Sequence, residues 1–164
     1  MTDMAFAFEP VIEADFEMLL ALRLDVMRES LERIGRFDPQ RARERFRTNF
    51  RPRDTRRIRV GGAAAGCVAL WAEPDDAWRV EHFYLSPAYQ GRGLGSAVLR
   101  RLFDEATPNI RRFRVGALRD SAANRFYQRH GFVKIHEGEW DIDYERPVTP
   151  PPPAAPAAPR GSAG

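Results

Sequence analysis

A run of closely spaced glycines in mid-chain, Gln90-Gly91-Arg92-Gly93-Leu94-Gly95, constrains the fold of this chain more than any other feature. It follows a strand-like segment, Trp78 to Leu85, and precedes a helical segment from Gly95 to about Ala106. Glycine adopts backbone dihedrals that are closed to other residues and lets a ligand approach the main chain. The first turn of a helix leaves amide N–H groups without intrahelical partners, and these attract anions. The spacing therefore predicts a strand, a tight loop and a helix start that together bind a phosphate-sized anion.

Two common phosphate-binding patterns do not fit this loop. A P-loop requires a lysine followed by Ser or Thr after the last glycine, whereas Gly95 is followed by Ser96-Ala97. A dinucleotide-binding fold requires G-x-G-x-x-G directly after the first strand, whereas the run here is G-x-G-x-G in mid-chain. Both ligand classes are thus excluded. A purely structural role, in which the glycines make a tight turn and let the helix pack, stays open at this point.

The order of predicted elements indicates an α/β fold. The predicted strands are Phe6–Phe8, Arg57–Val60, Ala63–Trp71, Trp78–Leu85, Phe113–Leu118, Val133–His136 and Trp140–Tyr144, and the predicted helices are Ala14–Arg28, Pro39–Phe50, Gly95–Ala106 and a helix capped by Asp120-Ser121 that runs to Arg129. Asp38 is expected to cap the second helix, and the glycine pair Gly61-Gly62 to turn a hairpin. Gly131 is expected to end the last helix in a left-handed conformation. Strands and helices mixed in this order predict a mixed sheet with helices on its faces.

The length of 164 residues suits one domain. The segment from Pro147 to Gly164 is rich in proline and alanine and has no large apolar residue after Val148. Such a composition cannot form a core and favours polyproline II conformations. We therefore predict a folded domain over residues 3–146 and a disordered tail over residues 147–164. A role of the tail as the ligand of a proline-recognition domain is the alternative.

The cysteine content and the hydropathy of the sequence indicate the cellular location of the protein. The single Cys67 excludes an intramolecular disulfide, and one cysteine with three histidines makes no convincing zinc site, so no metal is expected. No apolar run reaches the roughly 18 residues that a membrane span needs. The first ten residues lack the basic region of a signal peptide. These features predict a cytoplasmic protein without a membrane partner.

The basic residues do not indicate a nucleic-acid partner. Lys134 is the only lysine among 26 basic residues, and the net charge is only +3. Acids are interleaved with the arginines, as in Arg41-Ala42-Arg43-Glu44-Arg45. This pattern is typical of a solvated helix face with opposite-charge pairs. Nucleic-acid binding through the arginines is retained only as an alternative.

The glycine run and its flanks resemble the GNAT superfamily of N-acetyltransferases. Gln90 to Gly95 is similar to the Q/R-x-x-G-x-G/A signature of that family, and Phe83 to Tyr89 resembles its apolar strand, proline and aromatic residue before the loop. Asn124 to Tyr127 with Gly131-Phe132 resembles its ending, in which Gly-Phe follows a tyrosine after three residues. The resemblance covers about residues 3–146. It implies a GNAT-type single domain with a mixed, mostly antiparallel sheet flanked by helices.

This resemblance implies transfer of an acetyl group from acetyl-CoA to a primary amine of a small molecule or peptide. The backbone amides from Gly91 to Ser96 are implied to hold the CoA pyrophosphate. The implied cofactor-binding residues are Phe83, Tyr84, Leu85, Gln90, Gly91, Arg92, Gly93, Leu94, Gly95 and Ser96. Backbone groups of the first three are implied to lie along the pantetheine and the acetyl carbonyl.

Two residues are the candidate catalysts. By resemblance, Tyr127 is the general acid that protonates the departing thiolate; the alternative is a tyrosine that packs in the core. Glu81 is the candidate base for the amine proton, and the alternative is an ion-paired glutamate on the sheet. Strand alternation is expected to place Glu81 on the face of Phe83 and Leu85, with His82 on the opposite face. A histidine can titrate near neutral pH, but His82 is expected to point away from Glu81 and therefore ranks second as base.

Other residues are expected to be structural or to depart from the family. Asp120 stands seven residues before Tyr127, where the family often has a cofactor-binding asparagine. Its carboxylate would repel phosphate, so contact with the cofactor is doubtful. Cys67 is expected to be a small buried hydrophobe. Trp71, Trp78 and Trp140 are expected to pack against the core.

The resemblance implies an acceptor groove between the first helices and the last hairpin. The segments concerned are Met27–Arg33, Gly35–Asp38 and Glu137–Tyr144, and their acids Glu137, Glu139, Asp141 and Asp143 would suit a cationic amine. A homodimer is an expectation from the family alone. The principal alternative function is a non-catalytic acyl-CoA-binding sensor or interaction module.

Overall fold

The computed structural model describes residues 4–148. The strands are β1 (Ala7–Pro10), β2 (Thr55–Val60), β3 (Ala63–Glu73), β4 (Ala77–Leu85), β5 (Arg112–Leu118), β6 (Val133–Glu137) and β7 (Asp141–Pro147), and the helices are α1 (Phe16–Arg33), α2 (Pro39–Asn49), α3 (Leu94–Asp104) and α4 (Ala123–Arg129). Short 3-10 turns lie at Glu13–Asp15, Pro52–Asp54 and Pro87–Tyr89. The order of strands and helices is the predicted one. Of the predicted tail, Pro147 and Val148 are described, and the rest lies outside the described residues.

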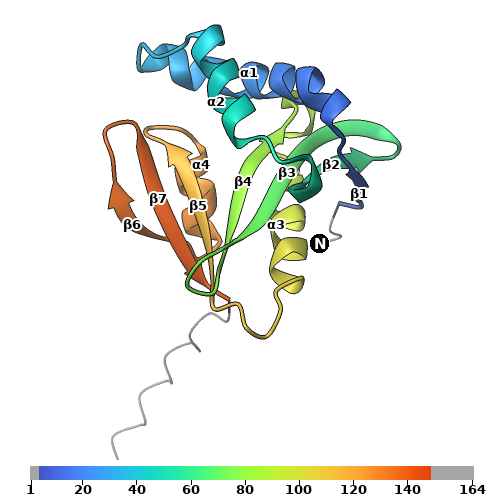
Figure 1. Ribbon diagram of the computed structural model, residues 1–164, viewed down its shortest axis with the longest axis vertical. Coiled ribbons are helices and arrows are strands. Elements are labelled where there is room, and N and C mark those ends of the chain that lie inside the picture. Colours follow the sequence, from blue (N-terminus) through green and yellow to red (C-terminus); the bar gives the residue numbers. More distant parts are fainter. Residues whose placement is uncertain (1–3, 149–164) are drawn as a thin grey trace, which may run out of the picture.

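The strands form one seven-stranded sheet in the order β1-β2-β3-β4-β5-β7-β6. Every neighbouring pair is antiparallel except β4 and β5, which are parallel. The predicted mixed, mostly antiparallel sheet flanked by helices is therefore confirmed. Figure 1 shows α1 and α2 crossing one end of the sheet.

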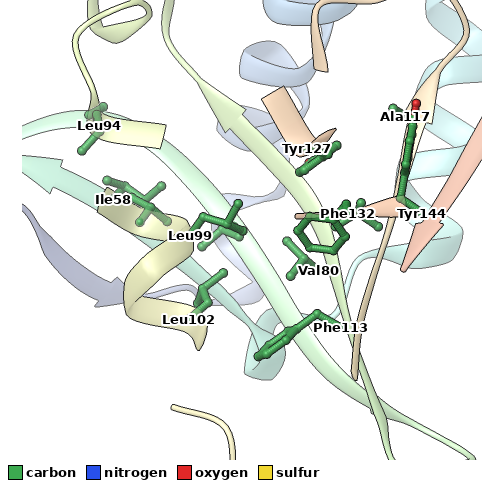
Figure 2. Packing of buried hydrophobic residues seen from close by; sticks show 14 residues of the cluster. Ile58, Val80, Leu94, Leu99, Leu102, Phe113, Ala117, Tyr127, Phe132 and Tyr144 are labelled. Atoms are coloured by element: carbon green, nitrogen blue, oxygen red, sulfur yellow. The ribbon is translucent and has the colours of Figure 1, made fainter. Parts of the chain in front are cut away.

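Two hydrophobic clusters fix the helices on the sheet. The main cluster joins α3 and α4 to the central strands through residues such as Leu99, Phe113 and Tyr127 (Figure 2). The second cluster joins α1 and α2 to β3 and β4 through residues that include Phe16 and Phe46, whose ring centroids lie 5.3 Å apart. The two helix pairs therefore cover different parts of the same sheet, and β4 contributes side chains to both clusters.

Most predicted turns and caps are present. Asp38 Oδ1 accepts hydrogen bonds from the N–H groups of Gln40 and Arg41 at 3.0 and 3.2 Å, so the predicted cap of α2 is confirmed. Gly61 and Gly62 have φ values of 57° and 82°, which match the predicted hairpin turn, and Gly131 has φ of 88° after α4.

The predicted cap of α4 by Asp120-Ser121 is wrong. The residue before the helix is Ala122, and no side chain caps it. Instead, the Asn124 side chain donates hydrogen bonds to the carbonyls of Leu118 and Ser121, both at 2.9 Å. Asn124 also accepts from the Tyr144 hydroxyl at 2.7 Å. A side chain inside the first turn thus ties α4 to both β5 and β7.

Within residues 4–148, none of the helices combines the length and the apolar character needed to cross a membrane.

Candidate active site

The centre of the sheet opens between its two parallel strands. β4 and β5 are paired only from Ala77–Arg79 to Arg112–Arg114. Beyond this point β4 stays paired to β3 as far as Leu85, and β5 stays paired to β7 as far as Leu118. Figure 1 shows the two strands diverging toward α1. Among the described strands, none pairs with the edge of β4 that faces β5 from Val80 onward, and the backbone groups of this edge are available to a ligand.

A bulge in β4 sets the direction of the side chains along this edge. Cys67 pairs with Tyr84, but Ala69 pairs with Glu81, so β4 has one residue more than β3 over this stretch. His82 provides the extra residue and has a left-handed φ of 48°. As a result, Val80 and Phe83 both pack with the main cluster, whereas Tyr84 packs with the second.

The expected strand alternation is therefore wrong at Glu81. Regular alternation would put Glu81 on the face of Phe83 and Leu85, but the bulge reverses the order between Val80 and Phe83. Glu81 follows Val80, which packs with the main cluster, so its side chain lies on the side of the second cluster, although its charge reaches both Tyr84 and Tyr127. Glu81 thus lies toward α1, at the open end of the β4–β5 separation.

The glycine run forms the loop between β4 and α3. Gly91 and Gly93 have φ values of 70° and 86°, and Gly93 is the residue before the first turn of α3. No side chain caps this helix start, so the N–H groups of its first turn remain available. A Cβ atom at Gly91 or Gly93 would meet no atom within 4 Å, which leaves open space beside the loop. The loop has the open N–H groups that an anion site requires.

Side chains of the loop support its shape. The Gln90 side chain donates to the Leu85 carbonyl at 2.9 Å and links the loop to the end of β4. Arg92 donates to the Ala88 carbonyl at 3.2 Å and stacks over Tyr89. Leu94 is fully buried, so only its backbone can reach a ligand. The side chains of Gln90, Arg92 and Leu94 therefore hold the loop, and its backbone remains free.

A histidine that the sequence reasoning missed connects the loop to α4. Ser96 Oγ lies 2.9 Å from His130 Nε2, and the His130 ring packs edge-on against Phe126 at 4.8 Å. Burial, together with Arg100, Arg129 and Arg146, lowers the pKa of His130. Phe126 also approaches Gly95, where an added Cβ would lie 3.2 Å from the ring. The start of α3 and the helix that carries Tyr127 are therefore one packed unit.

Tyr127 is buried near the separated strands. Its ring packs against Phe132 at 5.5 Å and against Phe126 at 5.4 Å. Burial raises the pKa of Tyr127, with smaller contributions from Glu81 and Tyr84, so the phenol stays protonated at neutral pH. No hydrogen bond joins its hydroxyl to another of residues 4–148, and the hydroxyl oxygen is not fully buried. The structure thus combines a protonated phenol with a carboxylate that lies within electrostatic range.

Glu81 has the environment of a weak base rather than of a surface acid. Burial raises the pKa of Glu81, while Arg79, whose Nη1 lies 3.8 Å from the carboxylate, opposes this shift. Arg23 also lowers the pKa, and Asp141 of β7 raises it. A carboxylate with a raised pKa accepts a proton more readily at neutral pH than an ordinary glutamate does.

His82, the second-ranked base, is built into the core. The side chain is 4% exposed, and its Nε2 donates to the Asn49 carbonyl at 3.0 Å. Its Nδ1 is buried without a partner in the described part of the chain, and the ring packs against Phe46 and Trp71. Burial lowers the pKa of His82 to about 4.

The buried histidine should make folding stability depend on pH. The unfolded state binds a proton below about pH 6.5 and the folded state only near pH 4, so stability falls as the pH drops between these values. The expected loss at pH 5.5 relative to pH 7.5 is about 1 kcal/mol from His82. Urea unfolding of the wild type and of His82→Asn at both pH values measures this contribution. An equal pH dependence in the two proteins would contradict it.

Helix α1 bridges the two halves of the opened sheet. Its last residue, Arg33, donates to the Asp120 carbonyl at 3.3 Å, and Arg36 lies over the Trp140 ring at 4.2 Å. The predicted acceptor segments therefore meet across the open end of the sheet. Asp120 is exposed and has a φ of 65°, and its carbonyl oxygen accepts the hydrogen bond from Arg33 of α1.

Two of the four predicted acids of the last hairpin form ion pairs with neighbouring side chains. Glu137 pairs with Arg119 at 2.8 Å and Lys134 at 3.0 Å, and Asp143 lies 3.4 Å from His136. Cys67 is buried, and burial raises its pKa to about 12. The thiol is therefore protonated at neutral pH, which agrees with the prediction of a small buried hydrophobe.

Comparison with known proteins gives a family and a fold. A model of the acetyltransferase (GNAT) domain matches residues 55–134, which include β4, the glycine loop, α3 and Tyr127. None of the curated proteins matches the chain significantly.

Several solved structures share the fold at low sequence identity. PaiA N-acetyltransferase from Thermoplasma acidophilum, solved with coenzyme A, is 15% identical with a TM-score of 0.67 over 88% of this chain and 99% of its own. An acetyltransferase from Thermus thermophilus is 20% identical with a TM-score of 0.69 over 90% of this chain and 99% of its own. N-acetylglutamate synthase from Neisseria gonorrhoeae, solved with coenzyme A and N-acetyl-glutamate, is 17% identical with a TM-score of 0.64 over 90% of this chain. This chain spans only 36% of the length of that synthase.

Proposed function

The chain belongs to the GNAT acetyltransferase family, and on this premise we propose that it transfers an acetyl group from acetyl-CoA to a primary amine. One observation supports the proposal: the start of α3, which has glycines and no side-chain cap, lies close in sequence to the edge of β4 that is not paired with β5. The first suits a pyrophosphate and the second suits an extended amide-containing chain. The unpaired strand edge begins the segment Val80 to Ser96, and the helix start ends it.

The residues present fit the cosubstrate. The backbone N–H groups from Gly91 to Ser96 would hold the pyrophosphate, because Gly91 and Gly93 leave the space beside them open. Backbone groups of Phe83 to Leu85 would pair with the pantetheine, because no strand covers that edge of β4. Coenzyme A is bound in the similar PaiA and N-acetylglutamate synthase structures, which supports this assignment.

Acetyl-CoA would supply a thioester: the amine nitrogen bonds to the acetyl carbon, the carbon–sulfur bond breaks and the sulfur leaves as a thiolate, so the amine must lose one proton and the thiolate must gain one. Glu81 takes the amine proton, directly or through water, because burial keeps its carboxylate basic. Tyr127 provides the proton for the sulfur, because its phenol is protonated and has no partner within residues 4–148. The bulge at His82 directs the Glu81 side chain toward α1. The part of the β4 edge that follows the bulge would then bind the cosubstrate.

Two linked measurements test this function. Acetyl-CoA at millimolar concentration should raise the melting temperature of the chain, and an amine panel should then release free thiol. Stabilisation without thiol release from any amine would favour a binding-only sensor. Salt-sensitive binding of DNA or RNA without stabilisation by acetyl-CoA would favour the nucleic-acid alternative.

Replacing Glu81 by glutamine should remove one titration from the pH profile. Below the pKa of Glu81, log kcat/KM should rise with pH with a slope of about two, because base and amine must both lose a proton. Above it the slope should be about one, up to the pKa of the amine. Glu81→Gln should lower kcat/KM about 100-fold and show a slope of about one throughout. Glu44→Gln, on the exposed face of α2, is the control, and an unchanged profile in Glu81→Gln would exclude Glu81 as the base.

A further inference from the structure

Among residues 4–148, Arg23 of α1 is a partly buried cation without an acidic partner. Its Nη1 donates to the Tyr84 hydroxyl at 2.5 Å, and its Nε is buried without a hydrogen-bond partner in residues 4–148. No carboxylate of the described residues lies within 4 Å of its guanidinium. A guanidinium has five N–H donors in a fixed planar arrangement. Most of the donors of Arg23 therefore have no acceptor in the described part of the chain.

Other arginines with a buried, unpartnered Nε differ in this respect. Arg57 pairs with Asp15 at 2.7 Å, and Arg119 pairs with Glu137 at 2.8 Å. In both, a carboxylate lies within ion-pair distance of the guanidinium. Because burying an unpaired charge is costly, a cation kept in this state is expected to receive its counter-ion from a ligand.

The position of Arg23 points to the acceptor rather than to the cosubstrate. Its partner Tyr84 belongs to the second cluster, on the side of α1 and α2, whereas Phe83, Leu85 and the glycine loop pack with α3 and α4. Arg23 contacts Tyr84, which lies on the same strand as Glu81, and the charges of Arg23 and of Asp141 in β7 both act on the Glu81 carboxylate. The open end of the sheet thus places a positive group beside negative ones, which matches a ligand that carries both charges.

We propose that the acceptor is an amine that also carries a carboxylate, as amino acids do, with the carboxylate bound by Arg23 and the amine held toward Glu81. A guanidinium binds a carboxylate through two parallel hydrogen bonds, which fixes the orientation of the ligand as well as its affinity. The proposal rests on the acetyl transfer proposed above and adds the class of acceptor. The carboxylate can belong to a free amino acid or to the C-terminus of a short peptide that presents its own amine.

Matched acceptor pairs test the proposal with the wild-type chain. L-phenylalanine is compared with 2-phenylethylamine, L-leucine with isoamylamine and L-lysine with cadaverine, and dipeptides such as glycyl-glycine distinguish the peptide source. Thiol release from acetyl-CoA is measured for each. We expect kcat/KM to be about 30-fold higher for the acid-bearing member, because a bidentate, charge-assisted pair of hydrogen bonds contributes a binding free energy of that size. Amines without a carboxylate that react as well as the acids would overturn the proposal and leave the acetyl transfer itself intact.

Arg23→Gln supplies the second measurement. It should raise KM for the acid-bearing acceptor about 30-fold and leave KM for acetyl-CoA unchanged. Arg23→Lys should recover part of the loss, because it keeps the charge without the bidentate geometry. The control is Arg43→Gln, on the neighbouring helix α2, whose side chain is 44% exposed and paired with Glu17. Acetyl-CoA stabilisation confirms that each variant is folded, and an equal loss on both members of every acceptor pair would refute the role of Arg23.

Discussion

Tyr127→Phe is expected to lower kcat about 100-fold, with KM for acetyl-CoA nearly unchanged. The substitution removes only the hydroxyl, which has no hydrogen-bond partner in residues 4–148, and keeps the ring between Phe126 and Phe132. Folding stability should therefore change by less than about 1 kcal/mol. Initial rates of thiol release, together with a urea titration, measure both quantities. Loss of activity without loss of stability would identify the phenol as the proton donor.

Tyr144→Phe is the matched control. Tyr144 is another buried tyrosine, whose ring centroid lies 6.5 Å from that of Tyr127, but its hydroxyl donates to Asn124 Oδ1 at 2.7 Å. Removing this hydrogen bond should cost about 1–2 kcal/mol of stability and leave kcat close to the wild-type value at low temperature. If Tyr127→Phe kept wild-type kcat, the ring would have only a packing role.

Gly66→Ala is expected to destabilise the fold by about 3 kcal/mol or more. A Cβ atom at this position would lie 2.1 Å from the carbonyl oxygen of Tyr84 and 3.1 Å from the Cα of Leu85. Both are backbone atoms of the strand beside β3, so relief requires β3 and β4 to move apart. This movement would also displace the edge of β4 that faces the cosubstrate. The variant should therefore show a lower melting temperature and weaker stabilisation by acetyl-CoA.

Gly116→Ala serves as the comparison for Gly66. At Gly116 of β5 a Cβ atom would lie 3.5 Å from Asp143 Oδ1, an ordinary contact, and φ is not left-handed. Alanine there should be neutral or should stabilise by a few tenths of a kcal/mol, because it restricts the unfolded chain. Equal stability of the Gly66 and Gly116 variants would show that β3 can shift without cost.

Local signals predicted most of the fold. The Asp38-Pro39 pair, the Gly61-Gly62 turn and Gly131 each act through their own backbone conformation or through a neighbour four residues away or less, so the sequence contains the necessary information. The same holds for the loop at Gly91 and Gly93, whose left-handed dihedrals favour glycine.

The features that depend on contacts between distant segments could not be predicted from the sequence. The bulge at His82 exists because β4 has one residue more than β3 can match, and nothing in the β4 sequence alone indicates it. The contact of Ser96 with His130 spans 34 residues, and that of Arg23 with Tyr84 spans 61. The same holds for the hairpin acids, which were predicted to suit a cationic amine. Glu137 and Asp143 instead have ion-pair partners that only the folded chain brings close.

The most direct test of the account is a mass balance on the reaction. The chain is incubated with acetyl-CoA and an acceptor from the amino-acid panel, free thiol is measured, and the acetylated amine is quantified by mass spectrometry. We expect thiol and N-acetylated product to appear in equal amounts and both to decrease together in Tyr127→Phe. Thiol release without an acetylated amine, or neither product with any acceptor at millimolar acetyl-CoA, would contradict it.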